Sequence, residues 1–216
     1  MKKNNKIILS EFIASCFLVM VIVGSGIMAE NLTNDNAVRL LANTIATGAG
    51  LFVLITAFAN ISGAHLNPFV SLSMYLTKRI KGKDLLTYIP AQIFGCILGV
   101  MLANIFFEHS VLELSSKSRD GFHIFLAEIV ATFGLIFIIF ATLKDEKTTV
   151  AACVATYISA GYWFTSSTSF ANPAVAIART FTDSFTGINY LNTPTYIIAE
   201  LLGTIVAVFI IKKLLK

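Results

Sequence analysis

Six long apolar segments fill most of the 216-residue chain, and they constrain its fold more than any other feature. The hydrocarbon core of a bilayer takes about 20 apolar residues in helical form to cross. Each segment is close to that length, and only short polar stretches separate them. The segments run over residues 7–29, 38–58, 85–107, 122–143, 148–165 and 195–215. We therefore predict an all-α membrane protein with six transmembrane helices, in a single domain over residues 1–216.

The composition agrees with this prediction. Apolar residues make up 56% of the chain and charged residues 13%, whereas soluble domains carry about 25% charged residues. The net charge of +4 does not indicate nucleic-acid binding, because the basic residues cluster at segment ends. The N-terminal Met1-Lys2-Lys3 also suits a cleaved signal peptide, but the apolar run after it is too long and contains Glu11. Three cysteines inside apolar segments show neither disulfide nor metal spacing.

The distribution of Lys and Arg predicts the orientation of the helices. Twelve of the sixteen basic residues fall on one side of the membrane if there are six spans. Cytoplasmic loops carry the excess of Lys and Arg, so both termini are expected to be cytoplasmic. The twelve are Lys2, Lys3, Lys6, Lys78, Arg79, Lys81, Lys83, Lys144, Lys147, Lys212, Lys213 and Lys216. The other side holds only Arg39, Lys117, Arg119 and Arg179 as cations.

The two halves of the chain repeat one pattern. Asn67-Pro68 recurs 105 residues later as Asn172-Pro173, and the run around Glu11 recurs 117 residues later around Glu128. A third match, 108 residues apart, pairs Tyr88-x-x-Ala91-Gln92-x-x-Gly95 with Tyr196-x-x-Ala199-Glu200-x-x-Gly203. Each copy holds three spans, about 7–107 and 122–215. Since three is odd, the copies are inverted relative to each other, and the functional site is expected at their interface near the midplane.

Each Asn-Pro pair predicts the start of a short helix. Asn is a strong N-cap, and Pro is favoured in the first helical turn. About ten semi-apolar residues follow each pair, too few to cross a membrane. The stretches before them are then expected to be re-entrant loops that line a watery cavity. Two half-helix N-termini that meet there would repel cations, while the amides of Asn67 and Asn172 donate to a passing solute oxygen.

With these motifs, the sequence resembles the aquaporin and aquaglyceroporin (major intrinsic protein) family over essentially its whole length. The matching residues are Ser62 to Pro68, Glu11, Glu128, Ala91-Gln92-x-x-Gly95 and Asn172-Pro173-Ala174. The resemblance implies an hourglass pore in each subunit of a homotetramer and facilitated diffusion of small neutral solutes. It implies no cofactor, metal or catalytic residue.

The resemblance also assigns residues to the pore. The centre is expected at Asn67, Pro68, Phe69, Asn172, Pro173 and Ala174, with His65, Gly63, Ala64, Phe170 and Ala171 lining the pore beside it. Glu11 and Glu128 are expected to anchor the two loops through backbone N–H groups, although an acid–base pair or proton relay is the alternative for intramembrane carboxylates. A gating role for His65 is a further possibility.

Counting from the two Asn residues on the family pattern predicts the selectivity filter. The ring consists of Thr47, Ala160, Ser169 and Val175, with Gly161 replacing Ala160 if the loop shifts by one residue. Val175 stands where most members carry Arg, and Arg179 lies one turn later. A ring without charged or aromatic side chains would be wide and suited to larger neutral solutes.

Three further departures from the family pattern bear on the pore. Phe69 replaces the Ala of the first box and is expected to pack below Asn67 rather than block the passage. Ala176 stands where glycerol channels typically carry Asp. Ser169 replaces the Cys that often confers block by mercurials, so mercurials are expected to act poorly at the filter.

The stretch from Tyr162 to Val175 resembles a bacterial subgroup associated with arsenic-resistance gene clusters, which implies location in the bacterial inner (plasma) membrane. The expected solutes are glycerol-like polyols, neutral arsenite-type species such as As(OH)3, and water. The alternatives are a water-selective aquaporin and a structural membrane protein whose pore Phe69 closes. An intramembrane enzyme lacks a nucleophile or metal spacing, and an ion-coupled transporter leaves the symmetry of Glu11 and Glu128 unexplained.

Overall fold

The computed structural model describes residues 3–214, which form an all-helical bundle. The six long helices of this region are α1 (Lys3–Leu32), α2 (Asn36–Phe58), α4 (Gly82–Phe106), α5 (Phe122–Thr142), α6 (Lys147–Phe164) and α8 (Thr193–Leu214). Their positions confirm the six predicted segments to within a few residues. Lys2 and Lys216, which the charge pattern used, lie outside the described residues.

Five of the long helices are long and apolar enough to cross a membrane. The sixth, α6, has 18 residues but is less apolar, because Ser, Thr and Tyr interrupt its run. It packs against α2 and α5 within the bundle. Its polar side chains can therefore be held by protein rather than by lipid.

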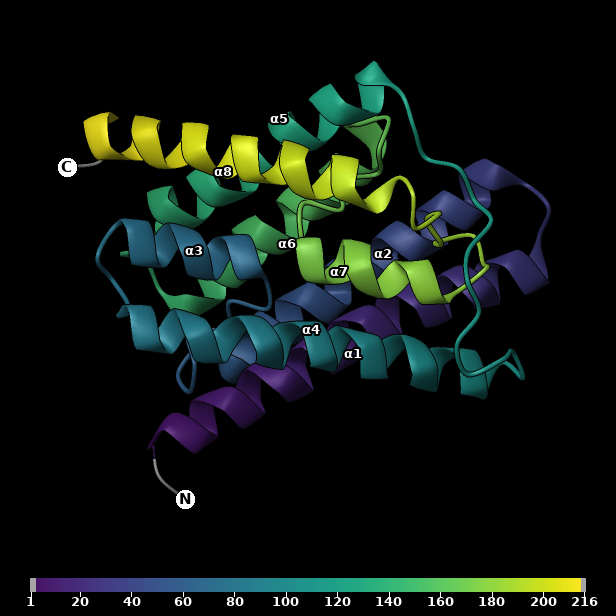
Figure 1. Cartoon of the computed structure of the whole chain (residues 1–216), viewed down its shortest axis with the longest axis horizontal. Helices are drawn as coiled ribbons and strands as arrows, with labels where there is room; N and C mark the ends of the chain where they lie inside the picture. The colour runs from purple at the N-terminus through teal and green to yellow at the C-terminus, as the bar shows by residue number, and fades with distance from the viewer. Residues whose placement is uncertain (1–2, 215–216) are drawn as a thin grey trace.

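The two short helices stand where the Asn-Pro pairs predict them. α3 (Pro68–Leu76) and α7 (Pro173–Ala178) each begin directly after an Asn N-cap, and a 3-10 turn, η1 (Arg179–Phe181), extends α7. Figure 1 shows them inside the bundle, pointing at each other from opposite ends. Both termini lie at the end that holds α3. We call this the terminal end of the bundle and the opposite one the distal end.

Close helix pairs mark the repeat in three dimensions. In the first half α1 packs on α4, and in the second half α5 packs on α8. Gly95 of α4 sits where a Cβ would strike the backbone carbonyl of Phe12, and its counterpart in the repeat, Gly203 of α8, stands in the same relation to the carbonyl of Ile129. Glycine is required at both crossings because nothing larger fits between the helices.

Candidate functional site

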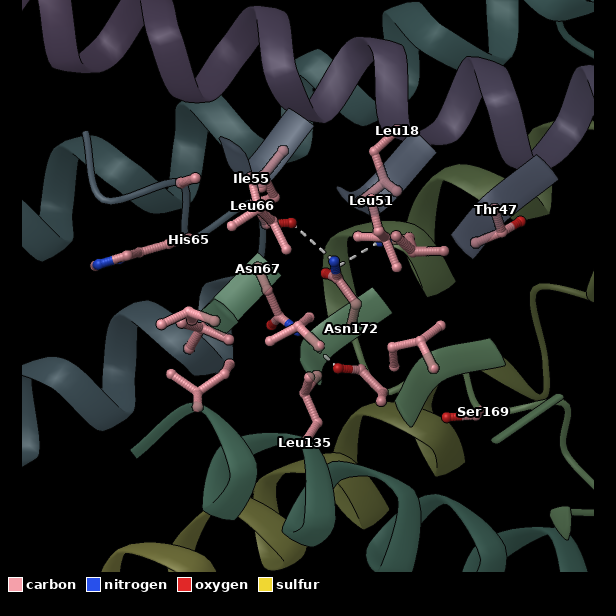
Figure 2. A pocket seen from close by; sticks show the side chains of 18 of the residues that line it. Leu18, Thr47, Leu51, Ile55, His65, Leu66, Asn67, Leu135, Ser169 and Asn172 are labelled. Atoms are coloured by element: carbon pink, nitrogen blue, oxygen red, sulfur yellow. Dashed lines mark hydrogen bonds between the residues drawn. The ribbon is translucent and has the colours of Figure 1, made fainter. Parts of the chain in front are cut away.

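The N-termini of the two half-helices meet at the centre of the bundle. Asn67 Oδ1 accepts the N–H of Phe69 at 2.8 Å, and Asn172 Oδ1 accepts the N–H of Ala174 at 3.1 Å. Because the cap occupies the oxygen of each amide, each NH2 group is turned away from its own helix. Asn67 Nδ2 donates to the carbonyl of Ala171 at 2.6 Å, and Asn172 Nδ2 donates to that of Leu66 at 2.8 Å. Figure 2 shows the two side chains crossing between the half-helices.

Each Asn amide keeps one N–H that this exchange does not use, since an NH2 group carries two donors. Both side chains border the same cavity. The residues that follow them in the Asn-Pro boxes, Phe69 and Ala174, are buried but do not line it. Phe69 therefore packs into the protein, away from the passage.

The re-entrant loops before the caps share an unusual backbone. Gly63, Ala64 and Leu66 have φ values of 90°, 49° and 52°. The residues 105 positions later, Thr168, Ser169 and Ala171, have φ values of 64°, 51° and 47°. This left-handed region is unfavourable for residues with a Cβ by about 1–2 kcal/mol each. The same strained path in both loops shows that the duplication extends to backbone conformation.

Buried carboxylates hold these strained loops. Glu11 accepts the N–H groups of His65 at 3.0 Å and Leu66 at 2.8 Å, together with the Ser62 hydroxyl at 2.6 Å. Glu128 accepts the corresponding N–H groups of Phe170 at 2.9 Å and Ala171 at 2.8 Å. Both carboxylates are fully buried and are not among the residues that line the channel cavity described below. The hydrogen bonds to the loops explain why each carboxylate lies inside the membrane, and no catalytic role is needed to explain it.

A narrow cavity of about 100 Å³ passes the two Asn side chains. The wall around the Asn pair is mostly aliphatic, and Figure 2 shows Leu18, Leu51, Ile55 and Leu135 in it. The loop residues His65, Gly63, Ala64, Phe170 and Ala171 all border it. His65 Nδ1 lies 2.9 Å from the Ser71 hydroxyl, so its ring is oriented by the first half-helix.

Polar groups gather in the cavity on the distal side of the Asn pair. Thr47, Ser169 and Val175 are buried and line it, in the positions counted from the family pattern. The Thr47 hydroxyl lies 3.1 Å from the hydroxyl of Tyr162, which reaches into the ring from α6. Ser169 Oγ is buried without a hydrogen-bond partner in the described part of the chain. The ring therefore carries hydroxyl groups.

The prediction for α6 is wrong. Ala160 lies on an exposed face of the helix and does not border the cavity, whereas Tyr162 does. Gly161 faces the loop instead, where a Cβ would strike the Ser169 side chain. The expected ring without aromatic side chains is consequently wrong as well. Arg179 also borders the cavity, so one turn of α7 brings its guanidinium to the ring that Val175 leaves uncharged.

The model of the family described as "Major intrinsic protein" matches residues 1–163 of the chain. The chain belongs to the major intrinsic protein family. The match covers the first Asn-Pro box, both carboxylate anchors and all but the last residue of α6, while the second box lies beyond it.

Relatives within the family extend the similarity to the whole chain. The chain is 47% identical to aquaglyceroporin AqpS of Rhizobium meliloti over 96% of its own length and 89% of that protein. It is 28% identical to aquaporin-4 of Rattus norvegicus over 94% of its length and 65% of that protein. The X-ray structure of the aquaglyceroporin from Plasmodium falciparum superposes with a TM-score of 0.77 at 21% identity, covering 98% of this chain and 97% of that one. That structure shares the fold.

Two features of the site were not predicted from the sequence. Tyr162 is one; its only signal is that Val154, Ile158 and Tyr162 follow one another at four-residue spacing and all face the cavity. The other is a second recess at the distal end, next to the ring, lined by Lys117, Arg119 and Arg179. The recess has no sequence signal, because Arg179 comes from a different part of the chain from Lys117 and Arg119.

Proposed function

We propose that this chain is a passive channel for small uncharged solutes. The observation that carries the proposal is the meeting of two half-helix N-termini, with two free amide N–H groups, beside a narrow cavity. The cavity extends from Lys147 near the terminal end to Arg179 at the distal end. Members of the major intrinsic protein family share this arrangement of boxes, and the overall similarity to AqpS supports the assignment.

Ions are excluded by the same arrangement that admits neutral solutes. Each half-helix N-terminus carries about half a positive charge, so a cation meets repulsion from both as well as the cost of losing its water. A neutral oxygen instead accepts hydrogen bonds from Asn67 and Asn172. The aliphatic wall opposite them offers no replacement for an ion's hydration shell.

Among neutral solutes, we propose glycerol-like polyols, neutral arsenite-type species and water. The hydroxyls of Thr47 and Tyr162, which lie 3.1 Å apart beside the cavity, supply hydrogen bonds to solute OH groups. The aliphatic wall suits the carbon side of a polyol. The relative AqpS is itself named an aquaglyceroporin.

We further propose that the chain works as a homotetramer in a bacterial plasma membrane, with the terminal end in the cytoplasm. The basic residues of the described chain that flank the long helices are concentrated at that end. The bundle also exposes large apolar side chains on several helices, including Phe94, Val53 and Phe209. Lipid and neighbouring subunits can both cover such surfaces.

Solute flux into proteoliposomes tests the proposal. Vesicles that contain the protein should take up glycerol faster than empty vesicles, without a rise in Na⁺ or K⁺ conductance. Thr47→Trp should remove the increase by filling the ring. Ile45→Trp is the matched control, because Ile45 lies on the same helix with 63% of its surface exposed. Flux equal to that of empty vesicles would favour the structural alternative with a closed pore.

A further inference from the structure

Three cations converge on one recess at the distal end of the bundle. Lys117 and Arg119 come from the segment between α4 and α5, and Arg179 follows α7. All three line a recess of about 210 Å³, together with Asn43 and Phe185. Arg179 also borders the channel cavity. The recess therefore opens beside the distal entrance of the channel.

Backbone carbonyls hold these cations in place. Lys117 Nζ donates to the carbonyl of Phe185 at 2.6 Å, and Arg119 Nη2 donates to the same oxygen at 3.1 Å. Arg119 Nε donates to the carbonyl of Gly187 at 2.8 Å, and Arg179 Nε donates to that of Thr186. One loop thus orders all three side chains, without neutralising their charge.

In the described part of the chain, no carboxylate lies within 4.0 Å of any of the three cations. Two acids of the distal end have other partners. Glu30 accepts the N–H of Phe185 at 2.8 Å and lies 4.0 Å from Arg39. Asp183 accepts the N–H of Ser116 at 2.9 Å. The recess thus holds an excess of positive charge.

Arg179 has the least favourable environment of the three cations. It is 97% buried, and its two terminal nitrogens have no hydrogen bond within the described residues. Its guanidinium lies 3.5 Å from the centre of the Phe170 ring, while that of Arg119 lies 5.3 Å from the same centre. A buried charge without a counter-charge is costly, and like charges this close add to the cost.

The same concentration of positive charge affects the pKa of the Lys117 ammonium. Burial, together with Arg119 and Arg179, lowers its pKa to about 8. An anion in the recess would relieve all three groups at once. The fork of donors on a guanidinium matches the oxygens of phosphate or sulfate, and such charge-assisted bonds are among the strongest hydrogen bonds in proteins.

We propose that the recess binds one small tetrahedral oxyanion, held by Lys117, Arg119 and the terminal nitrogens of Arg179. The ion is a ligand and not a permeant solute, because the aliphatic wall further along the narrow cavity offers no replacement for its hydration shell. Bound next to Arg179, it narrows the distal entrance and slows neutral solutes. The oxyanion is either a free ion or the phosphate of an anionic lipid headgroup.

Binding of sulfate to the purified protein in a neutral detergent tests the site without any measurement of flux. Isothermal titration with sodium sulfate, at constant ionic strength in sodium chloride, should show saturation near one ion per chain. Lys117→Gln should weaken binding about tenfold, as expected for the loss of one charge-assisted bond, and Lys117→Arg should restore it. Lys83→Gln, the same change on an exposed residue at the terminal end, should have no effect.

The proposal is overturned if sulfate and chloride give the same heats, or if Lys117→Gln and Lys83→Gln bind sulfate equally well. Arg119→Gln should weaken binding as well; if it does not fold, the two Lys117 variants still decide. Competition identifies the source of the oxyanion. If phosphatidylglycerol in mixed micelles displaces sulfate and phosphatidylcholine does not, the site takes headgroups, whereas sulfate binding unaffected by either lipid indicates a free ion. Both results support the site.

Discussion

Glu200 and Gln92 occupy equivalent places in the two repeats but make different hydrogen bonds. Gln92 Nε2 donates to Glu11 at 2.8 Å and to the Ser71 hydroxyl at 3.0 Å. Glu200 accepts the N–H of Asn172 at 2.9 Å, while its other oxygen is buried without a partner in the described chain. Its side chain lies beside that of Glu128. The second repeat thus places two carboxyl groups where the first pairs a carboxylate with an amide.

We expect Glu200→Gln to stabilise the protein. The amide can still accept from Asn172 and can donate to Glu128, as Gln92 does to Glu11. A hydrogen bond to a charged group contributes about 1.5–3 kcal/mol, and 1 kcal/mol raises Tm by about 2–4 °C in a chain of this size. Thermal unfolding in detergent measures the change. The reciprocal variant Gln92→Glu should lower Tm; a lower Tm for both would contradict this account.

Val175 lines the channel cavity together with Thr47 and Ser169, and we expect Val175→Arg to extend into that cavity. The new side chain would lie near Arg179 and narrow the ring, so glycerol flux should fall at least tenfold more than water flux. Stopped-flow light scattering of proteoliposomes measures both rates. Leu112→Arg adds the same group on the exposed distal segment and should change neither. An equal loss for both solutes would argue against Val175 as part of the filter.

At the scale of elements, each half of the channel is a short helix and a strained loop held by one long helix. Glu128 on α5 joins the second loop to the bundle, as Glu11 on α1 joins the first. The left-handed residues of each loop lie next to the N–H groups that the carboxylate accepts. The hydrogen bonds therefore offset backbone strain at the point where it arises.

We expect Glu128→Ala to release this loop. It leaves the N–H groups of Phe170 and Ala171 buried without acceptors, at about 1–3 kcal/mol for each group. The Tm should fall, and glycerol flux should fall with it, because Ser169 and Asn172 lose their positions. Glu113→Ala, which removes a partly exposed acid of the distal segment, should leave both unchanged. Full flux in Glu128→Ala would show that the loop holds without its anchor.

For the whole molecule, charge differs between the two ends. Lysines of the terminal end, such as Lys83 and Lys144, reach outward with little burial. Distal cations instead pack inward around one recess. Lys117 is surrounded there by Arg119, Arg179 and Arg39, with Glu30 as the opposing charge.

The lowered pKa of Lys117 predicts a specific dependence of stability on pH. Its pKa is about 8 in the folded protein, against an ordinary value of 10.5. Between these values the unfolded chain binds more protons, so Lys117 destabilises the fold below about pH 8 and this effect is lost as pH rises toward 10.5. Measured without sulfate, the Tm of the wild type relative to Lys117→Gln should rise over that window. The difference in Tm between the wild type and Lys83→Gln should not change with pH. If the difference between the wild type and Lys117→Gln did not change either, the lowered pKa of Lys117 would be contradicted.

The sequence alone determined the helices, the half-helices, the inverted repeat and the residues that cap and anchor the loops. These follow from local chemistry and duplication, since apolar length defines a span, Asn-Pro starts a helix and matched positions imply matched contacts. Tertiary structure decided which side of α6 faces the channel. A helix turns by about 100° per residue, so a small error in counting back across a strained loop selects the wrong face. The count selected Ala160 for the channel wall. In the structure Gly161 packs against Ser169, and Tyr162 faces the channel instead. The recess of Lys117, Arg119 and Arg179 likewise depends on folding, because only the packed bundle brings these separate segments against one loop of carbonyls.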